Sequence, residues 1–190
     1  MKIEGSSIAF IVICTGLVFL MTPALAFFYG GLERRKNVIS TMMMSVVSLA
    51  LATVMWFAVG YSLSFSGDGN LIGDLGHAFF QGVSDSESTR GLTIPDSLFA
   101  VFQMMFSIIT VGILTGSVAG RMRFKPLLIF IVGWLLLVYY PFAHMVWDEG
   151  LLAQWGTIDF AGGDVVHITS GVSGLVLALV VGKRKDFNRL

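Results

Sequence analysis

The residues that could do chemistry in this sequence are few, and they lie within or beside long apolar stretches. His167 lies in the last of these stretches, and a carboxylate and a glycine pair precede it in residues 159–163. An imidazole takes up and releases a proton near neutral pH, but in hydrocarbon it needs a partner, water or a protein interior around it. His167 is therefore a candidate for proton transfer. The alternative is a structural histidine bonded to the carbonyl of a neighbouring helix.

Aromatic residues form the second group of candidates. Trp147 follows an apolar stretch, where an indole either binds a cation on its ring face or anchors the chain at a membrane interface. Phe102 and Phe106 are four residues apart and therefore share one face of a helix. They either line a pore or simply pack. His144 is a supporting group for such a site or an interfacial residue.

The composition limits the classes of protein that these residues can serve. Hydrophobic residues make up 55% and charged residues 13%, about half the usual charge content, which excludes a water-soluble globular protein. The formal net charge of zero argues against a nucleic-acid partner. A lone cysteine and three histidines without helical pair spacing give no metal site, and no cofactor is expected. Without a phosphate-binding loop or a nucleophile elbow, we do not expect an enzyme.

Five apolar stretches are long enough to cross a bilayer, so the sequence predicts an all-α membrane protein in which residues 1–190 form part of one larger domain. A retained first helix is favoured over a cleaved signal peptide, because Lys2 is offset by Glu4. The polar segment 66–96 is predicted to be a loop, with a short turn near 75–80. The predicted spans are approximately 7–28, 39–65, 97–119, 126–146 and 164–181.

Charge gives the orientation of these spans. Ten of the twelve basic residues follow the first, third and fifth spans, and only Lys2 and Arg90 fall on the other side. Because Lys and Arg collect in cytoplasmic loops, we expect a cell-membrane protein with its N-terminus outside and the end of this segment in the cytoplasm. An odd number of spans also suits the first of two inverted repeats.

The helical rise per residue ranks the candidates by depth. Counted from the inner basic clusters, Trp147 comes out at the outer interface, with Phe106 and His167 below it at a common level. A row of glycines at 112, 116 and 120 indicates close helix approach. The glycine pair at 162 and 163 predicts a broken helix start whose N–H groups remain available.

Three separated motifs resemble one known family. The chain looks like the N-terminal half of an ammonium transporter of the Amt/Rh class, closer to the Amt branch, over essentially all 190 residues. The motifs are 22–32 (TPALAFFYGGL) with 35–37 (RKN), 141–147 (PFAHMVW) and 159–167 (DFAGGDVVH).

The resemblance implies an eleven-helix fold, with a pore in each monomer and assembly as a homotrimer in the lipid bilayer. It implies that Trp147 belongs to an outer cation-recruitment site, that Phe106 is a gate beneath it, and that His167 is the first of two pore histidines. It makes Asp159 a structural and electrostatic support of the recruitment site. The sixth to eleventh helices are missing, so we expect these residues to be a fragment.

The expected function is channel-like transport of ammonium, which would be recruited as the cation, deprotonated, and passed as ammonia through a hydrophobic pore. A cytoplasmic regulatory protein is a further partner that such a transporter could have. The alternative is an ammonium-sensing membrane domain of a larger signalling protein. The sequence on the C-terminal side of Leu190 would decide between the two.

Overall fold

A computed structural model describes residues 2–184, and within this range the chain is helical, without strands. Five helical spans are long and apolar enough to cross a membrane, which confirms the predicted fold class. They are Gly5–Gly31, Val38–Phe65, Asp96–Val118, Phe124–Gln154 and Gly163–Val181.

The third span, α4 (Asp96–Val118), is the centre of the bundle and packs against the first, second and last spans. Its glycine row explains how closely the first span, α1 (Gly5–Gly31), can approach. A Cβ atom added at Gly116 would lie 2.3 Å from the ring of Tyr29, and the hydroxyl of that tyrosine donates to the carbonyl of Ile113 at 3.1 Å. The predicted close approach of helices is confirmed at Gly116, whereas Gly120 lies beyond the end of α4, with a positive φ of 66°.

The second and fourth spans are each interrupted by a π-helical turn. The second runs as α2 (Val38–Met55), η1 (Trp56–Gly60) and α3 (Tyr61–Phe65). The fourth runs as α5 (Phe124–Trp134), η3 (Leu135–Tyr139) and α6 (Tyr140–Trp147), followed by the short α7 (Leu151–Gln154).

The two interrupted spans meet at these turns. A Cβ atom at Gly60 would lie 2.6 Å from the Tyr140 ring, and the Trp56 ring lies 5.9 Å from the same ring between centroids. In the fourth span the wide turn directly precedes Pro141, whose missing N–H breaks the regular helical ladder. The wide turns therefore lie where side chains from two spans interlock.

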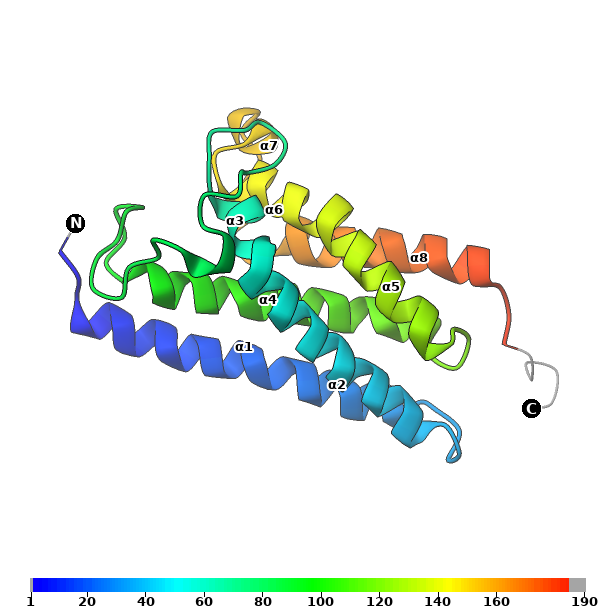
Figure 1. The fold of residues 1–190 in the computed structure, drawn as a ribbon. Helices are drawn as coiled ribbons and strands as arrows, with labels where there is room; N and C mark the ends of the chain where they lie inside the picture. Colours follow the sequence, from blue (N-terminus) through cyan, green and yellow to red (C-terminus); the bar gives the residue numbers. More distant parts are fainter. Residues whose placement is uncertain (1, 185–190) are drawn as a thin grey trace.

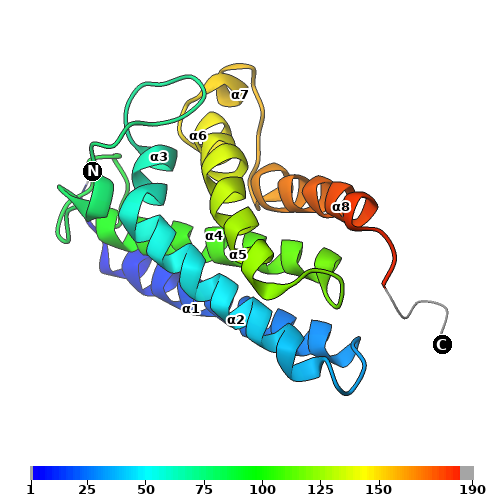
Figure 2. The same cartoon turned by 45° about the vertical axis from the view of Figure 1, so that its right-hand side comes forward.

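Polar loops gather at one end of the bundle. Figures 1 and 2 show the N-terminus, the segment between α3 and α4, and α7 at this end. The backbone N–H of Glu4 donates to the carbonyl of Thr93 at 3.0 Å and joins the N-terminus to that segment. The predicted loop there contains the 3-10 turn η2 (Ala78–Phe80), inside the short turn that the sequence predicts. We call residues 66–95 the outer loop.

Basic residues gather at the opposite end, where the α1–α2 and α4–α5 connections and the end of α8 (Thr169–Val181) lie (Figure 1). Arg184 pairs with the buried carboxylate of Glu33 at 2.6 Å, and Arg121 donates to the carbonyl of Gly182 at 3.2 Å. These contacts tie the first, third and last spans together at this end. Lys185 and Arg189 of the basic clusters lie outside the described residues.

Candidate functional site

An aromatic row runs from the end of α6 along the face of α4. The ring of Trp147 packs against Phe106 with 6.0 Å between centroids, and Phe106 packs edge-to-face on Phe102 at 5.0 Å. All three side chains are partly buried. The structure thus brings together the three aromatic residues that the sequence singles out, with Phe106 in contact with both others.

Asp159 joins this row to the last span. Its backbone carbonyl accepts the indole N–H of Trp147 at 3.1 Å. Its carboxylate accepts four backbone N–H groups at the start of that span, from Gly162, Gly163, Asp164 and Val165, at 2.7 to 3.0 Å. A carboxylate that accepts several N–H groups at a helix start stabilises that start.

The expectation that these N–H groups remain available is therefore wrong. Asp159 occupies them, because the chain turns back at Gly162, which has a φ of 83° in the left-handed region. Glycine adopts this conformation without the steric cost that a Cβ atom brings. The site residue that looks from sequence like an electrostatic neighbour is the cap of the helix start.

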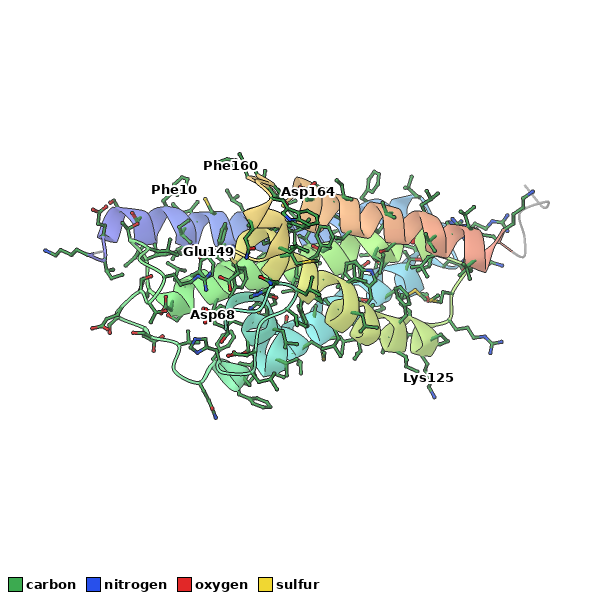
Figure 3. The ribbon with its side chains drawn as sticks, turned by 90° about the horizontal axis from the view of Figure 1, so that it is seen from above. Phe10, Asp68, Lys125, Glu149, Phe160 and Asp164 are labelled. Carbon is green, nitrogen blue, oxygen red and sulfur yellow. The ribbon has the colours of Figure 1, made fainter. Side chains whose placement is uncertain are left out.

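His167 lies in the π-helical segment η4 (Gly163–Ile168), which leads into α8. Its backbone N–H donates to the carbonyl of Gly162 at 3.0 Å, across the wide turn. The side chain is exposed, and within residues 2–184 its ring makes no hydrogen bond. The alternative role for His167 is that of a structural histidine whose ring bonds to a helix carbonyl. Among residues 2–184 this bond does not occur. Figure 3 shows Asp164, at the start of the same segment, beside Phe160.

His144 lies in α6, the helix that ends at Trp147, and is fully buried. Its Nδ1 is 3.2 Å from the carbonyl oxygen of Ser64, and its Nε2 is 2.5 Å from that of Gly69. Nδ1 also lies 3.4 Å from a carboxylate oxygen of Asp148. His144 therefore attaches the outer loop to α6.

Arg90 is a part of the site that the sequence does not reveal as such. Its guanidinium stacks over the rings of Phe65 and Phe99, 5.1 Å from each centroid, donates to the carbonyl of Phe65 at 3.0 Å, and pairs with Asp148. Burial lowers the pKa of Arg90 from its ordinary value. The one available signal was its place as the only basic residue of the outer loop.

A polar cleft of about 820 Å³ opens at the outer end beside Trp147. Its walls come from the outer loop and from the chain after α6, and Figure 3 shows Asp68 and Glu149 on this side of the molecule, far from Lys125. Within residues 2–184, no group of three or more His, Cys, Asp or Glu side chains could hold a metal ion. The ionisable residues of the cleft are Asp68, His77, Arg90, Asp148 and Glu149.

Five membrane-length helices, two of them broken by wide turns, with an aromatic row beside a polar cleft, define a multi-pass helical membrane protein. Residues 9–189 match the model of the Ammonium Transporter Family, and the chain belongs to this family.

Among relatives, the chain is 51% identical to an ammonium transporter of Bacillus subtilis, over 93% of this chain and 44% of that protein. It is 41% identical to the ammonium transporter Amt1 of Archaeoglobus fulgidus, over 97% of this chain and 45% of that protein. The chain thus spans somewhat less than half the length of these relatives.

Solved structures of Mep2 and Amt proteins share the fold of this chain. The crystal structure of Mep2 from Saccharomyces cerevisiae superposes with a TM-score of 0.86 at 37% identity, covering 96% of this chain and 42% of that one. A structure described as a sensor Amt protein superposes with a TM-score of 0.82 at 29% identity, covering 94% of this chain and 45% of that one.

Proposed function

We propose that these residues form the first half of a channel-like ammonium transporter, in which Trp147 helps to recruit the cation and His167 handles its proton. One chain of contacts carries the proposal. The ring of Trp147 packs on Phe106, and its N–H is held by Asp159, which caps the segment that bears His167. Trp147 and the segment that bears His167 are thereby joined through Asp159.

Recruitment follows from the properties of an aromatic face. With its N–H bonded to Asp159, Trp147 offers its ring rather than a hydrogen-bond donor. A cation over such a face gains about 0.5 to 2 kcal/mol. This gain is far below the cost of moving a bare ion into hydrocarbon. The aromatic site therefore collects ammonium at the cleft but does not carry it inward as an ion.

Loss of a proton removes most of that cost. Neutral ammonia can pass an apolar path beside Phe106, whereas potassium has no proton to lose. A neutral imidazole accepts and releases protons near neutral pH, and His167 stands exposed at the start of the last span. We assign to it the orientation of the neutral species or the relay of its proton.

The remaining half of the transporter is proposed to cover His167. The curated relatives are more than twice the length that this chain spans, and the side chain of His167 at the start of the last span is exposed in the described residues. An ionisable group at membrane depth is expected to face protein or water. We infer that a second, inverted set of helices packs there and completes the pore.

Trimer assembly and orientation belong to the same proposal. Only 6% of the residues in an 18-residue apolar stretch of α1 are buried. This helix therefore has a long face for lipid or for a neighbouring subunit. The basic connections at the end opposite the outer loop support a cytoplasmic location for that end. The N-terminus is then outside, and a regulatory protein would bind on the basic side.

The Trp147→Leu variant tests the recruitment role in the complete protein that carries these residues. The half-saturating ammonium concentration should rise roughly 2- to 30-fold, which is the loss of one cation–π contact, while the maximal uptake rate changes less. Uptake measured against ammonium concentration decides the outcome. An unchanged concentration dependence would make Trp147 an interface anchor only.

The second candidate function is ammonium sensing, which the likeness to a sensor Amt protein favours. A sensor would bind ammonium at the same outer site and pass the signal to a further domain. Uptake by purified protein in vesicles separates the two functions. Saturable ammonium flux supports transport, whereas binding without flux supports sensing.

A further inference from the structure

The end of α6 is fastened to the outer loop by a small network around Asp148. Arg90 pairs with one oxygen of this carboxylate, and His144 Nδ1 lies 3.4 Å from the other. The backbone N–H of Asp148 also closes α6 by donating to the carbonyl of His144 at 3.2 Å. The residue directly after Trp147 is therefore held from several directions.

Arg90 is itself fixed in place. It lies between two aromatic rings, Phe65 at the end of α3 and Phe99 at the start of α4, and donates to the Phe65 carbonyl. Its side chain is only 23% exposed. The guanidinium thus links two spans and the outer loop to the end of a third span.

Trp147 needs such support because it is the last residue of α6, and helix ends fray. Its ring must keep one position to contact Phe106 and to line the outer cleft. We propose that Arg90, acting through Asp148, is a positioning residue that holds the ring of Trp147 at the recruitment site. This role rests on the proposed function of Trp147 and adds a residue to it.

A purely electrostatic role for Arg90 makes a different prediction. If its charge alone mattered, by neutralising Asp148 next to the cleft, lysine would replace it. If position matters, lysine fails, because it lacks the planar fork that stacks between rings and donates in two fixed directions. Arg90→Lys therefore separates charge from geometry.

The test measures ammonium uptake by the complete protein with Arg90→Lys. Positioning predicts a rise of roughly 3- to 10-fold in the half-saturating concentration, a loss comparable to part of one cation–π contact, with the maximal rate within about two-fold. Asp85→Asn, an exposed charge change on the outer loop, is the matched control and should leave both values unchanged. A native concentration dependence in Arg90→Lys would overturn the positioning role.

A double-mutant comparison shows whether the effect passes through Trp147. In the Trp147→Leu background, Arg90→Lys should cause no further change. An equal shift in both backgrounds would mean that Arg90 acts on the cation directly and would overturn the proposal. If Trp147→Leu alone changes nothing, the recruitment function itself fails, which is a separate result.

A second pair of variants keeps the test decisive if Arg90→Lys does not accumulate. Arg90→Gln alone leaves the Asp148 carboxylate without its cation, whereas adding Asp148→Asn removes that unpaired charge without restoring the guanidinium fork between the two rings. Positioning therefore predicts that the half-saturating concentration of the double variant stays raised roughly 3- to 10-fold over native. A double variant with the native half-saturating concentration would overturn the positioning role.

Discussion

Asp159 is the residue on which the geometry of the site depends most. One carboxylate accepts four backbone N–H groups, and the same residue's carbonyl holds the indole of Trp147. One residue therefore caps the start of the last span with its side chain and holds the indole of Trp147 with its backbone. Its carboxylate is occupied by the N–H groups of the helix start, so we do not expect it to bind the cation directly.

Replacing Asp159 should destabilise the whole site. Asp159→Ala leaves four N–H groups without their acceptor, so the free energy of unfolding should fall by about 2 kcal/mol or more. Thermal unfolding of the purified protein in detergent measures this. Asp159→Asn, which keeps one acceptor oxygen, should lose less. Equal stability of Asp159→Ala and native protein would show that the cap contributes nothing.

The residues of the site were predictable to different degrees. Trp147, Phe106 and Phe102 follow from residue type and helical spacing, and their contacts are local to two helix faces. The role of Arg90 depends on a contact with Asp148, 58 residues further along the chain. No periodicity relates a loop residue to such a partner, so spacing could not find this pair.

At the scale of elements, the glycine row of α4 controls how α1 packs. Gly116→Ala would place a methyl group 2.3 Å from the Tyr29 ring, so α1 must shift. We expect a loss of about 1 to 3 kcal/mol, the usual cost of overpacking. Gly133→Ala in α5, where a Cβ atom meets nothing within 4 Å, is the matched control and should be neutral or slightly stabilising. Thermal unfolding of the two variants in parallel gives the comparison, and equal losses would argue against close packing at Gly116.

Asp74 accepts hydrogen bonds within a turn of the outer loop, and this arrangement predicts a dependence on pH. A hydrogen bond from the Ser66 hydroxyl at 2.5 Å and one from the Gly76 N–H at 2.8 Å lower the pKa of Asp74 below its ordinary value. Because the folded pKa is depressed, the ionised carboxylate stabilises the loop above about pH 4, the unfolded value. This contribution is lost as the pH falls through the lower folded value.

Hydrogen exchange, corrected for intrinsic rates, tests this in residues 66–76. In the native protein, protection of these amides from exchange should decrease between about pH 6 and about pH 3. These two pH values lie about one to two units above and below the ordinary pKa of an aspartate. The same segment of Asp74→Asn should show weaker protection without that decrease. If protection in the native protein does not depend on pH, the ionised Asp74 does not stabilise the loop.

The spans were predictable from long apolar runs, but their internal breaks were not. The five predicted stretches differ from the observed helices mainly in the fourth, which continues past residue 146 through Trp147. The π-helical turns depend on tertiary contacts such as the close approach of Gly60 and Tyr140. Hydrophobic periodicity indicates which face of a helix is buried. It carries no information on a π-helical turn that packs against the ring of a residue far away in the sequence.

At the scale of the whole molecule, the two ends differ in charge and in their loops, and this asymmetry predicts the orientation. Single cysteines at Asp85 and Lys125, in protein with Cys14 replaced by Ser, test it by labelling intact cells with a reagent that does not cross membranes. Asp85→Cys should be labelled and Lys125→Cys should not. The opposite pattern would reverse the topology.

The open faces of the described residues also belong to this scale. His167 and much of α8 are exposed, and the chain spans less than half the length of its curated relatives. A pore needs walls on all sides, so the proposed transport is tested in the complete protein that carries these residues. Measurements on His167 must therefore be made there, with assembly checked by size.

The most direct test of the deprotonation mechanism is the ion selectivity of His167 variants. Ammonium and potassium uptake are compared in native protein, His167→Ala and His167→Asp. The native protein should transport ammonium and exclude potassium, His167→Ala should lose proton-coupled transport, and His167→Asp, with a fixed anion, should either block flux or admit potassium. If both variants transport ammonium at the native rate and still exclude potassium, His167 does not handle the proton and the mechanism is wrong.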